Sequence, residues 1–309
     1  MTIIGRVTQQ TVQRSTLANL QLNLSAMAVL QQRLSSSKKI TKPSDDPAGT
    51  AAAMTLRGGL RANAQQSTNI DDGTGWLTTI DSSLTSSLDS LSRARDLTVQ
   101  GSNTAVMSPA ARESIAVEID GLRDALISQA NTSYLGRSVF AGTSGAGAAV
   151  TVTGVPDPTV PGSTQTYTAN GVAGASVTRR IDPNTVVRVD VDGAATFGTG
   201  ATSVFATLDK ISATLRAGGD VTSQLTALDA NRDAIIGQLA SVGARENQVT
   251  AAQTRALATK TTLTSQLSTV EDVDLAATIV DEQAQEVSYK AALGATARVL
   301  QPTLMDYLK

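Results

Sequence analysis

The chain contains no cysteine and no histidine among its 309 residues. Their absence excludes catalytic cysteines, histidine general bases, Ser–His–Asp triads, and zinc or haem sites built on Cys or His. Aromatic residues are also scarce, at 3% of the chain, although 41% of it is apolar. A globular enzyme of this length would use more aromatic side chains in its core, so the composition favours an elongated helical protein.

Long apolar runs are missing too. No stretch approaches the ~18 residues of a membrane-spanning helix, and the first residues lack the apolar core of a secretory signal. We therefore expect no membrane insertion, and secretion without a cleaved signal peptide. We also expect no cofactor and no metal.

Charge is divided between the two ends of the chain. Residues 1–44 contain six basic residues and no acid, whereas residues 261–289 contain six acidic residues and no base. The complementary charges predict that the two ends meet, although two unrelated solvated faces would give the same pattern. A nucleic-acid partner is not expected, because the basic residues are not interleaved with aromatics.

Apolar periodicity predicts helices over most of the chain. The first spans 8–37, with a narrow seam at Leu17, Leu20, Leu24, Met27 and Leu34. Further helices are expected at about 47–100, 109–131 and 203–217. From Val221 to Val270 the seam keeps strict four-and-three spacing over seven heptads, which indicates a coiled-coil helix. A last helix over 272–300 carries Leu275, Ile279, Val287, Leu293 and Leu300 on roughly one face.

The segment KITKPSDDPAGTAAA (39–53) raises the question of whether its acidic pair is a metal or catalytic site. Pro43 and Pro47 lack backbone donors, so the first helix must stop near Ser37. Asp46 before Pro47 is typical of an N-cap followed by proline at the first helical position. Asp45 adds negative charge at the positive end of the helix dipole. We interpret the pair as helix punctuation.

Residues 137–200 differ from the rest, because Gly and Pro are frequent and alternating Val/Thr runs replace the helical period. AVTVTGV, SVTRRI and TVVRVDVDG predict short strands. DVDG at 190–193 lacks most of the oxygen ligands of a calcium loop, and we predict a hairpin turn there.

These elements predict a mainly α fold with a β insert. Both ends of the chain form an elongated antiparallel coiled-coil rod, and a small β domain is added to it. The expected segments are an N-terminal helix (1–42), two halves of the helical rod (43–136 and 201–271), the β domain (137–200) and a C-terminal helix (272–309). The terminal helices carry only thin apolar seams, so we expect them to order on polymerisation.

Two stretches resemble the flagellin superfamily: LQLNLSAMAVLQQRLSSSKKITKPSDDPAGTAAA near the N-terminus, and VEDVDLAATIVDEQAQEVSYKAALGATARVLQPTLMDYL at the C-terminus. KPSDDP and GRSVFAG (136–142) are more similar to the hook–filament junction proteins of that superfamily than to flagellins. The likeness covers about 1–142 and 203–309. Ser37 departs from the pattern, because the family usually has Gly there.

The resemblance implies a structural, non-catalytic subunit of the bacterial flagellum. It would join the hook, through hook-associated protein 1, to the flagellin filament, outside the cell. Its partners would be its own copies, hook-associated protein 1, flagellin, the flagellar type III export apparatus and an export chaperone. The N-terminal seam would pack against the C-terminal one, with Arg14 and Arg33 near acids such as Glu271, Asp281 or Glu286.

Other interpretations remain open at this point. The chain could be a flagellin, the filament subunit itself. It could also be a soluble coiled-coil adaptor or adhesin that shares only the helical seams. For each seam residue, a contact within the core of a single chain is an alternative to an assembly contact.

Overall fold

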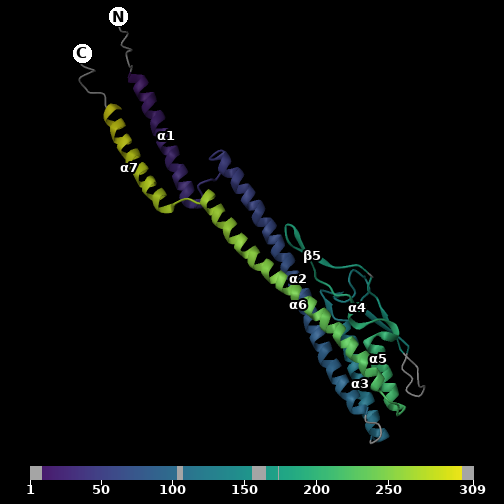
Figure 1. The fold of residues 1–309 in the computed structure, drawn as a ribbon. Coiled ribbons are helices and arrows are strands. Elements are labelled where there is room, and N and C mark those ends of the chain that lie inside the picture. The colour runs from purple at the N-terminus through teal and green to yellow at the C-terminus, as the bar shows by residue number, and fades with distance from the viewer. Residues whose placement is uncertain (1–8, 103–106, 155–164, 173, 301–309) are drawn as a thin grey trace, which may run out of the picture. The chain divides into compact units, whose positions relative to one another are not determined.

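The computed structural model describes residues 9–102, 107–154, 165–172 and 174–300. The helices are α1 (Gln9–Ser36), α2 (Pro47–Gly101), α3 (Pro109–Ala130), α4 (Gly193–Phe197), α5 (Val204–Arg216), α6 (Thr222–Glu271) and α7 (Leu275–Leu300), with a 3₁₀ turn at Gly200–Thr202 (Figure 1). The strands are β1 (Ser133–Tyr134), β2 (Arg137–Ser138), β3 (Val150–Thr153), β4 (Thr166–Ala169), β5 (Thr178–Asp182) and β6 (Thr185–Arg188). The predicted class, mainly helical with a small β part, is confirmed.

The described residues fall into two compact units. The first unit comprises residues 1–62 and 259–309, and the second comprises residues 63–258. Helices α2 and α6 each contribute to both units. The segment boundaries expected from the sequence, among them 42 and 272, stay a prediction.

Helices α2 and α6 pack in the second unit through matched heptads. On α6, every seventh residue from Leu228 to Ala256 is buried, and on α2 every seventh residue from Asn63 to Thr98 is buried. The Asn63 side-chain amide donates to the Ala256 carbonyl at 3.1 Å, near one end of this stretch. Arg95 pairs with Asp229 at 2.7 Å near the other end. The helices are therefore antiparallel, and the predicted seam of α6 is its buried face.

The described part of the β segment contains three antiparallel strand pairs, β1–β2, β3–β4 and β5–β6. Asn131 joins the end of α3 to the β segment, because its side-chain amide donates to the Val150 carbonyl and accepts from the Val150 amide. Phe140 meets Phe197 edge to face and Phe197 stacks on Phe205, with ring centroids 5.2 and 5.8 Å apart. All three phenylalanines of the chain are thus gathered where the β segment meets the helices.

The prediction of a hairpin turn at 190–193 is wrong. The turn between β5 and β6 falls at Pro183–Asn184, because Asp182 pairs with Thr185. Asp190 is fully buried and accepts from the Val177 amide and from Arg188 Nε, both at 2.8 Å. Asp192 caps α4 through the Ala194 amide at 2.9 Å. Both carboxylates therefore serve the local backbone.

A buried polar network ties β4 to the helices. Arg123 of α3 is only 6% exposed and pairs with Asp209 of α5, whose other carboxylate oxygen accepts from the Tyr167 hydroxyl at 2.6 Å. Burial and the neighbouring carboxylate raise the pKa of Tyr167. For Arg123, burial opposes the charge, but Asp209 and Asp124 outweigh it and raise its pKa. The network satisfies groups that would otherwise be costly to bury.

Candidate assembly interface

Helices α1 and α7 lie side by side in the first unit (Figure 1). The Gln285 side chain donates to Asn23 Oδ1 at 3.3 Å, and Lys38 contacts Asp272 farther along, so the two helices are antiparallel. Yet no apolar side chain described on α1 or α7 is buried. Among the described side chains of α1 and α7, only that of Thr278, which is polar, is buried.

The predicted assembly residues are largely on the surface of this pair. Leu20, Met27, Leu34 and Arg33 are half-buried, and Arg14 is exposed. The exposed apolar side chains are Leu17 (58%), Leu24 (49%), Leu275 (46%), Ile279 (46%), Val287 (66%) and Leu293 (43%). Leu300 ends α7, but its side chain lies outside the described residues.

Sequence reasoning missed three further exposed apolar residues on these helices, Leu22 (65%), Val29 (44%) and Val280 (64%). They lie outside the single apolar seam that was predicted on each helix. A count of all apolar residues on the helical surface would have found them. The exposed apolar surface of the pair is therefore wider than one seam.

Basic residues of the N-terminal part pair with acidic residues of the C-terminal part at Glu271 and Asp272. Glu271, at the end of α6, has a side chain only 4% exposed, and it pairs with Lys38 at 3.2 Å and with Arg57 at 2.8 Å. Lys38 also pairs with Asp272 at 2.8 Å, and this hydrogen bond raises the pKa of Lys38 and lowers that of Asp272. Among the ion pairs of the described residues, none involves Arg14 or Arg33. Their pairing with acids stays a prediction about the assembled state.

The backbone closes around the same ion pairs. The Lys39 amide donates to the Glu271 carbonyl at 2.6 Å, and the Val273 amide donates to the Ser37 carbonyl at 3.2 Å. We call residues 37–39 and 271–273 the terminal junction. Within the junction, Ser37 follows α1 with a φ of 54°, a left-handed conformation that favours glycine. The backbone at Ser37 is therefore strained in a way that a glycine at this position would avoid.

The acidic pair lies just after the junction and serves the backbone. Asp46 Oδ1 accepts from the Gly49 amide at 2.9 Å, and Pro47 is the first residue of α2. Asp45 Oδ2 accepts from the Thr41 hydroxyl and from the amides of Thr41 and Lys42. The Thr41 hydroxyl and these amides hold the pKa of Asp45 below its ordinary value. Pro43 lies between these partners, in the loop from α1 to α2.

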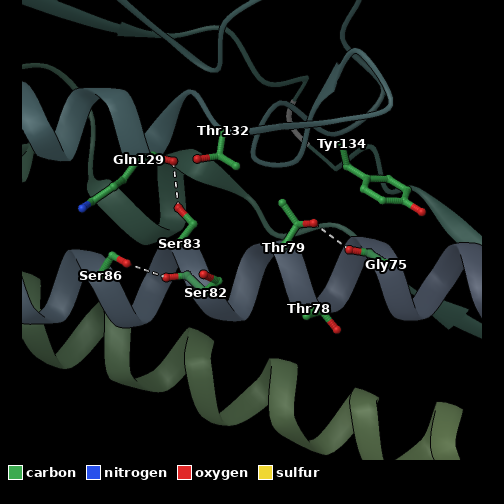
Figure 2. A pocket seen from close by; sticks show the side chains of 9 residues that line it. All are labelled: Gly75, Thr78, Thr79, Ser82, Ser83, Ser86, Gln129, Thr132 and Tyr134. Atoms are coloured by element: carbon green, nitrogen blue, oxygen red, sulfur yellow. Dashed lines mark hydrogen bonds between the residues drawn. The ribbon is translucent and has the colours of Figure 1, made fainter.

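An open groove of about 640 Å³ lies in the second unit, between α2 and the end of α3 (Figure 2). Its lining residues are Gly75, Thr78, Thr79, Ser82, Ser83, Ser86, Gln129, Thr132 and Tyr134. Several hydroxyls donate back to the chain, as Thr79 does to the Gly75 carbonyl at 2.7 Å and Ser83 to the Gln129 carbonyl at 2.8 Å. The lining offers no carboxylate, amine or guanidinium for acid–base chemistry.

The described residues contain no group of three or more acidic side chains placed to hold a metal ion. Within the same part of the chain, no helix combines the length and the apolarity that a membrane crossing requires.

The family model described as the bacterial flagellin N-terminal helical region matches residues 7–145. Among curated proteins, the chain is 33% identical over 140 residues to a flagellin of Bacillus subtilis (strain 168), covering 45% of this chain and 46% of that protein. It is 32% identical over 112 residues to flagellar hook-associated protein 3 of Escherichia coli (strain K12), covering 36% of this chain and 35% of that protein. The chain thus spans less than half the length of each relative.

Among solved structures, flagellar hook-associated protein 3 from Legionella pneumophila superposes with a TM-score of 0.59 at 14% identity. That match covers 70% of this chain and 98% of the other, and it shows the shared fold. The family match agrees with the resemblance that the N-terminal stretch carries.

Proposed function

We propose that this chain is a structural subunit of the flagellar hook–filament junction, because residues 7–145 match the flagellin N-terminal helical region and the fold is similar to that of a hook-associated protein 3. In this role it catalyses no reaction. It joins the hook, through hook-associated protein 1, to the flagellin filament. It is exported through the flagellar apparatus and acts outside the cell.

One observation carries the assembly part of this proposal. Two helices, of 28 and 26 residues, pack together without burying one described apolar side chain. Burying a Leu or Val side chain stabilises by about 1.5–3 kcal/mol, whereas ordering each residue costs about 1–2 kcal/mol in backbone entropy. A pair with this much exposed apolar surface needs further partners, and identical pairs from neighbouring copies provide them.

Limited proteolysis of the isolated chain tests this coupling. We expect rapid loss of about residues 1–40 and 272–309 and survival of a fragment containing the second unit. In assembled material the same cleavages should slow. Terminal helices that resist protease equally in isolated and assembled chains would argue against ordering on assembly.

The second candidate function is that of flagellin, favoured by the 33% identity to the Bacillus subtilis protein. Deleting the chain's coding sequence separates the two. Loss of a junction subunit should leave hooks without filaments and release flagellin into the medium, because filament subunits have nothing to attach to. Loss of the major flagellin should leave hooks without filaments and no released flagellin.

A further inference from the structure

The turn between β1 and β2 places a leucine where the fold of the single chain does not favour one. Tyr134 pairs with Arg137, so Leu135 and Gly136 form a two-residue turn, with φ values of 49° and 76°. Positive φ at both central positions is the geometry that favours Asn-Gly or Gly-Gly. Leu135 is also 78% exposed. Its side chain therefore strains the turn and gains no burial in return.

The turn is held firmly on α2. Trp76 is 2% exposed, the Tyr134 ring lies 5.8 Å from it at 60°, and the Arg137 guanidinium lies 6.0 Å from the Trp76 ring centre. A Cβ on Gly75 would come within 2.3 Å of the Tyr134 hydroxyl, so the glycine lets the tyrosine lie against the helix. Figure 2 shows Tyr134 at the Gly75 end of the groove. Leu135 is thus presented on a rigid support, which lowers the entropy cost of docking.

Charges left without an opposite partner suggest what the turn meets. Among the ion pairs of the described residues, none involves Arg137, Asp81 or Glu246. Asp81 of α2 and Glu246 of α6 are both half-buried. Burial and the charge of Asp81 raise the pKa of Glu246. An incoming guanidinium would be attracted to these carboxylates and would offset the repulsion between them.

The β1–β2 turn and Asp81 lie on different sides of α2. Asp81 is six residues beyond Gly75, which at about 100° per residue places it about 120° around the helix. A surface and its complement on different sides of one chain generate a head-to-tail contact between identical copies. We infer that the β1–β2 turn of one copy, through Leu135 and Arg137, docks on the Asp81–Glu246 surface of a second copy. The inference rests on the self-assembly proposed above.

Cysteine cross-linking tests the contact in assemblies of the full chain, which has no native cysteine. Leu135→Cys protein is mixed with Thr85→Cys protein, because Thr85 is exposed and lies one turn from Asp81. The matched control is Ser86→Cys, the next residue, which lines the groove instead. We expect oxidation to link Leu135→Cys to Thr85→Cys, with at least tenfold less product for Ser86→Cys.

Each other outcome overturns the inference. Assembly without the expected link, or with equal linking to both positions, would refute the contact and leave the proposed function standing. A chain that does not associate with itself under any condition would overturn both.

Leu135→Gly should change the thermal stability of the free chain and its self-association in opposite directions. The free chain should melt about 2–4 °C higher, because strain at the turn is relieved, while self-association should weaken about tenfold. A lower melting temperature would show that Leu135 stabilises its own chain, and unchanged association would refute docking. Arg137→Glu should weaken association similarly, and Asp81→Lys in the same chain should restore it. Lack of restoration would remove the charge pairing.

Discussion

Replacing Glu271 with Gln should loosen the terminal junction more than any comparable change at an exposed ion pair. The Glu271 side chain is 4% exposed and pairs with both Lys38 and Arg57, whose own side chains are 39% and 58% exposed. Hydrogen bonds to charged groups contribute about 1.5–3 kcal/mol each when buried, whereas exposed ion pairs contribute about 0–1 kcal/mol. Because both cations regain water when released, we expect a loss of about 1–2 kcal/mol.

Native-state hydrogen exchange of assembled chains, in which we expect the terminal helices to be ordered, measures this loss locally. The Lys39 and Val273 amides report on the junction, since both donate across it. Their protection factors should fall about 5–30-fold in Glu271→Gln. The matched control is Glu118→Gln, which breaks the exposed pair with Arg93 and should change the protection of neighbouring amides by less than about twofold.

Unchanged protection at both junction amides in Glu271→Gln would refute the view that the buried carboxylate holds the junction. Equal effects in the two variants would refute the use of burial to rank these ion pairs.

Three other changes test separate features. Ser37→Gly should raise the protection of the Lys39 amide against exchange by about 0.5–1 kcal/mol, because the relief of left-handed strain exceeds the added chain entropy. Ser36→Gly, in the last turn of α1, should lower this protection. A change of the same sign in both variants would contradict the strain argument. Tyr167→Phe should destabilise the chain by about 1–3 kcal/mol at pH 7 in thermal unfolding, because Asp209 loses a donor. The pKa of Tyr167 is raised in the folded state, so its contribution to the free energy of unfolding is complete below pH 10 and is lost as pH rises further. The difference in unfolding free energy between variant and parent should therefore narrow above pH 10. A constant difference from pH 8 to 11 would count against the bond. Arg14→Glu with Arg33→Glu should impair flagellar assembly while leaving the melting of the second unit unchanged, and normal assembly would remove the role of these charges.

Periodicity predicted the helices well because their burial is periodic. The seam from Val221 to Val270 was visible as a heptad pattern, and in the second unit its partner on α2 repeats at the same interval. The end of α1 and the start of α2 followed from Pro43, Asp46 and Pro47, since proline and capping chemistry act locally.

Features that depend on distant partners escaped prediction. Arg123 occupies a core position of α3 only because Asp209 and Tyr167 reach it from elsewhere in the chain. The charge asymmetry between the ends was visible, but not the register that brings Lys38 and Arg57 to Glu271. The turn predicted at 190–193 failed because Asp190 is satisfied by Val177 and Arg188 instead of lying in a turn.

Immunogold electron microscopy of intact flagella, with antibody against residues 150–197, tests the proposed place of this chain in the flagellum most directly. We predict label confined to the boundary between hook and filament. Label along the whole filament would contradict the junction role and identify a flagellin, and accessible epitope without flagellar label would contradict both.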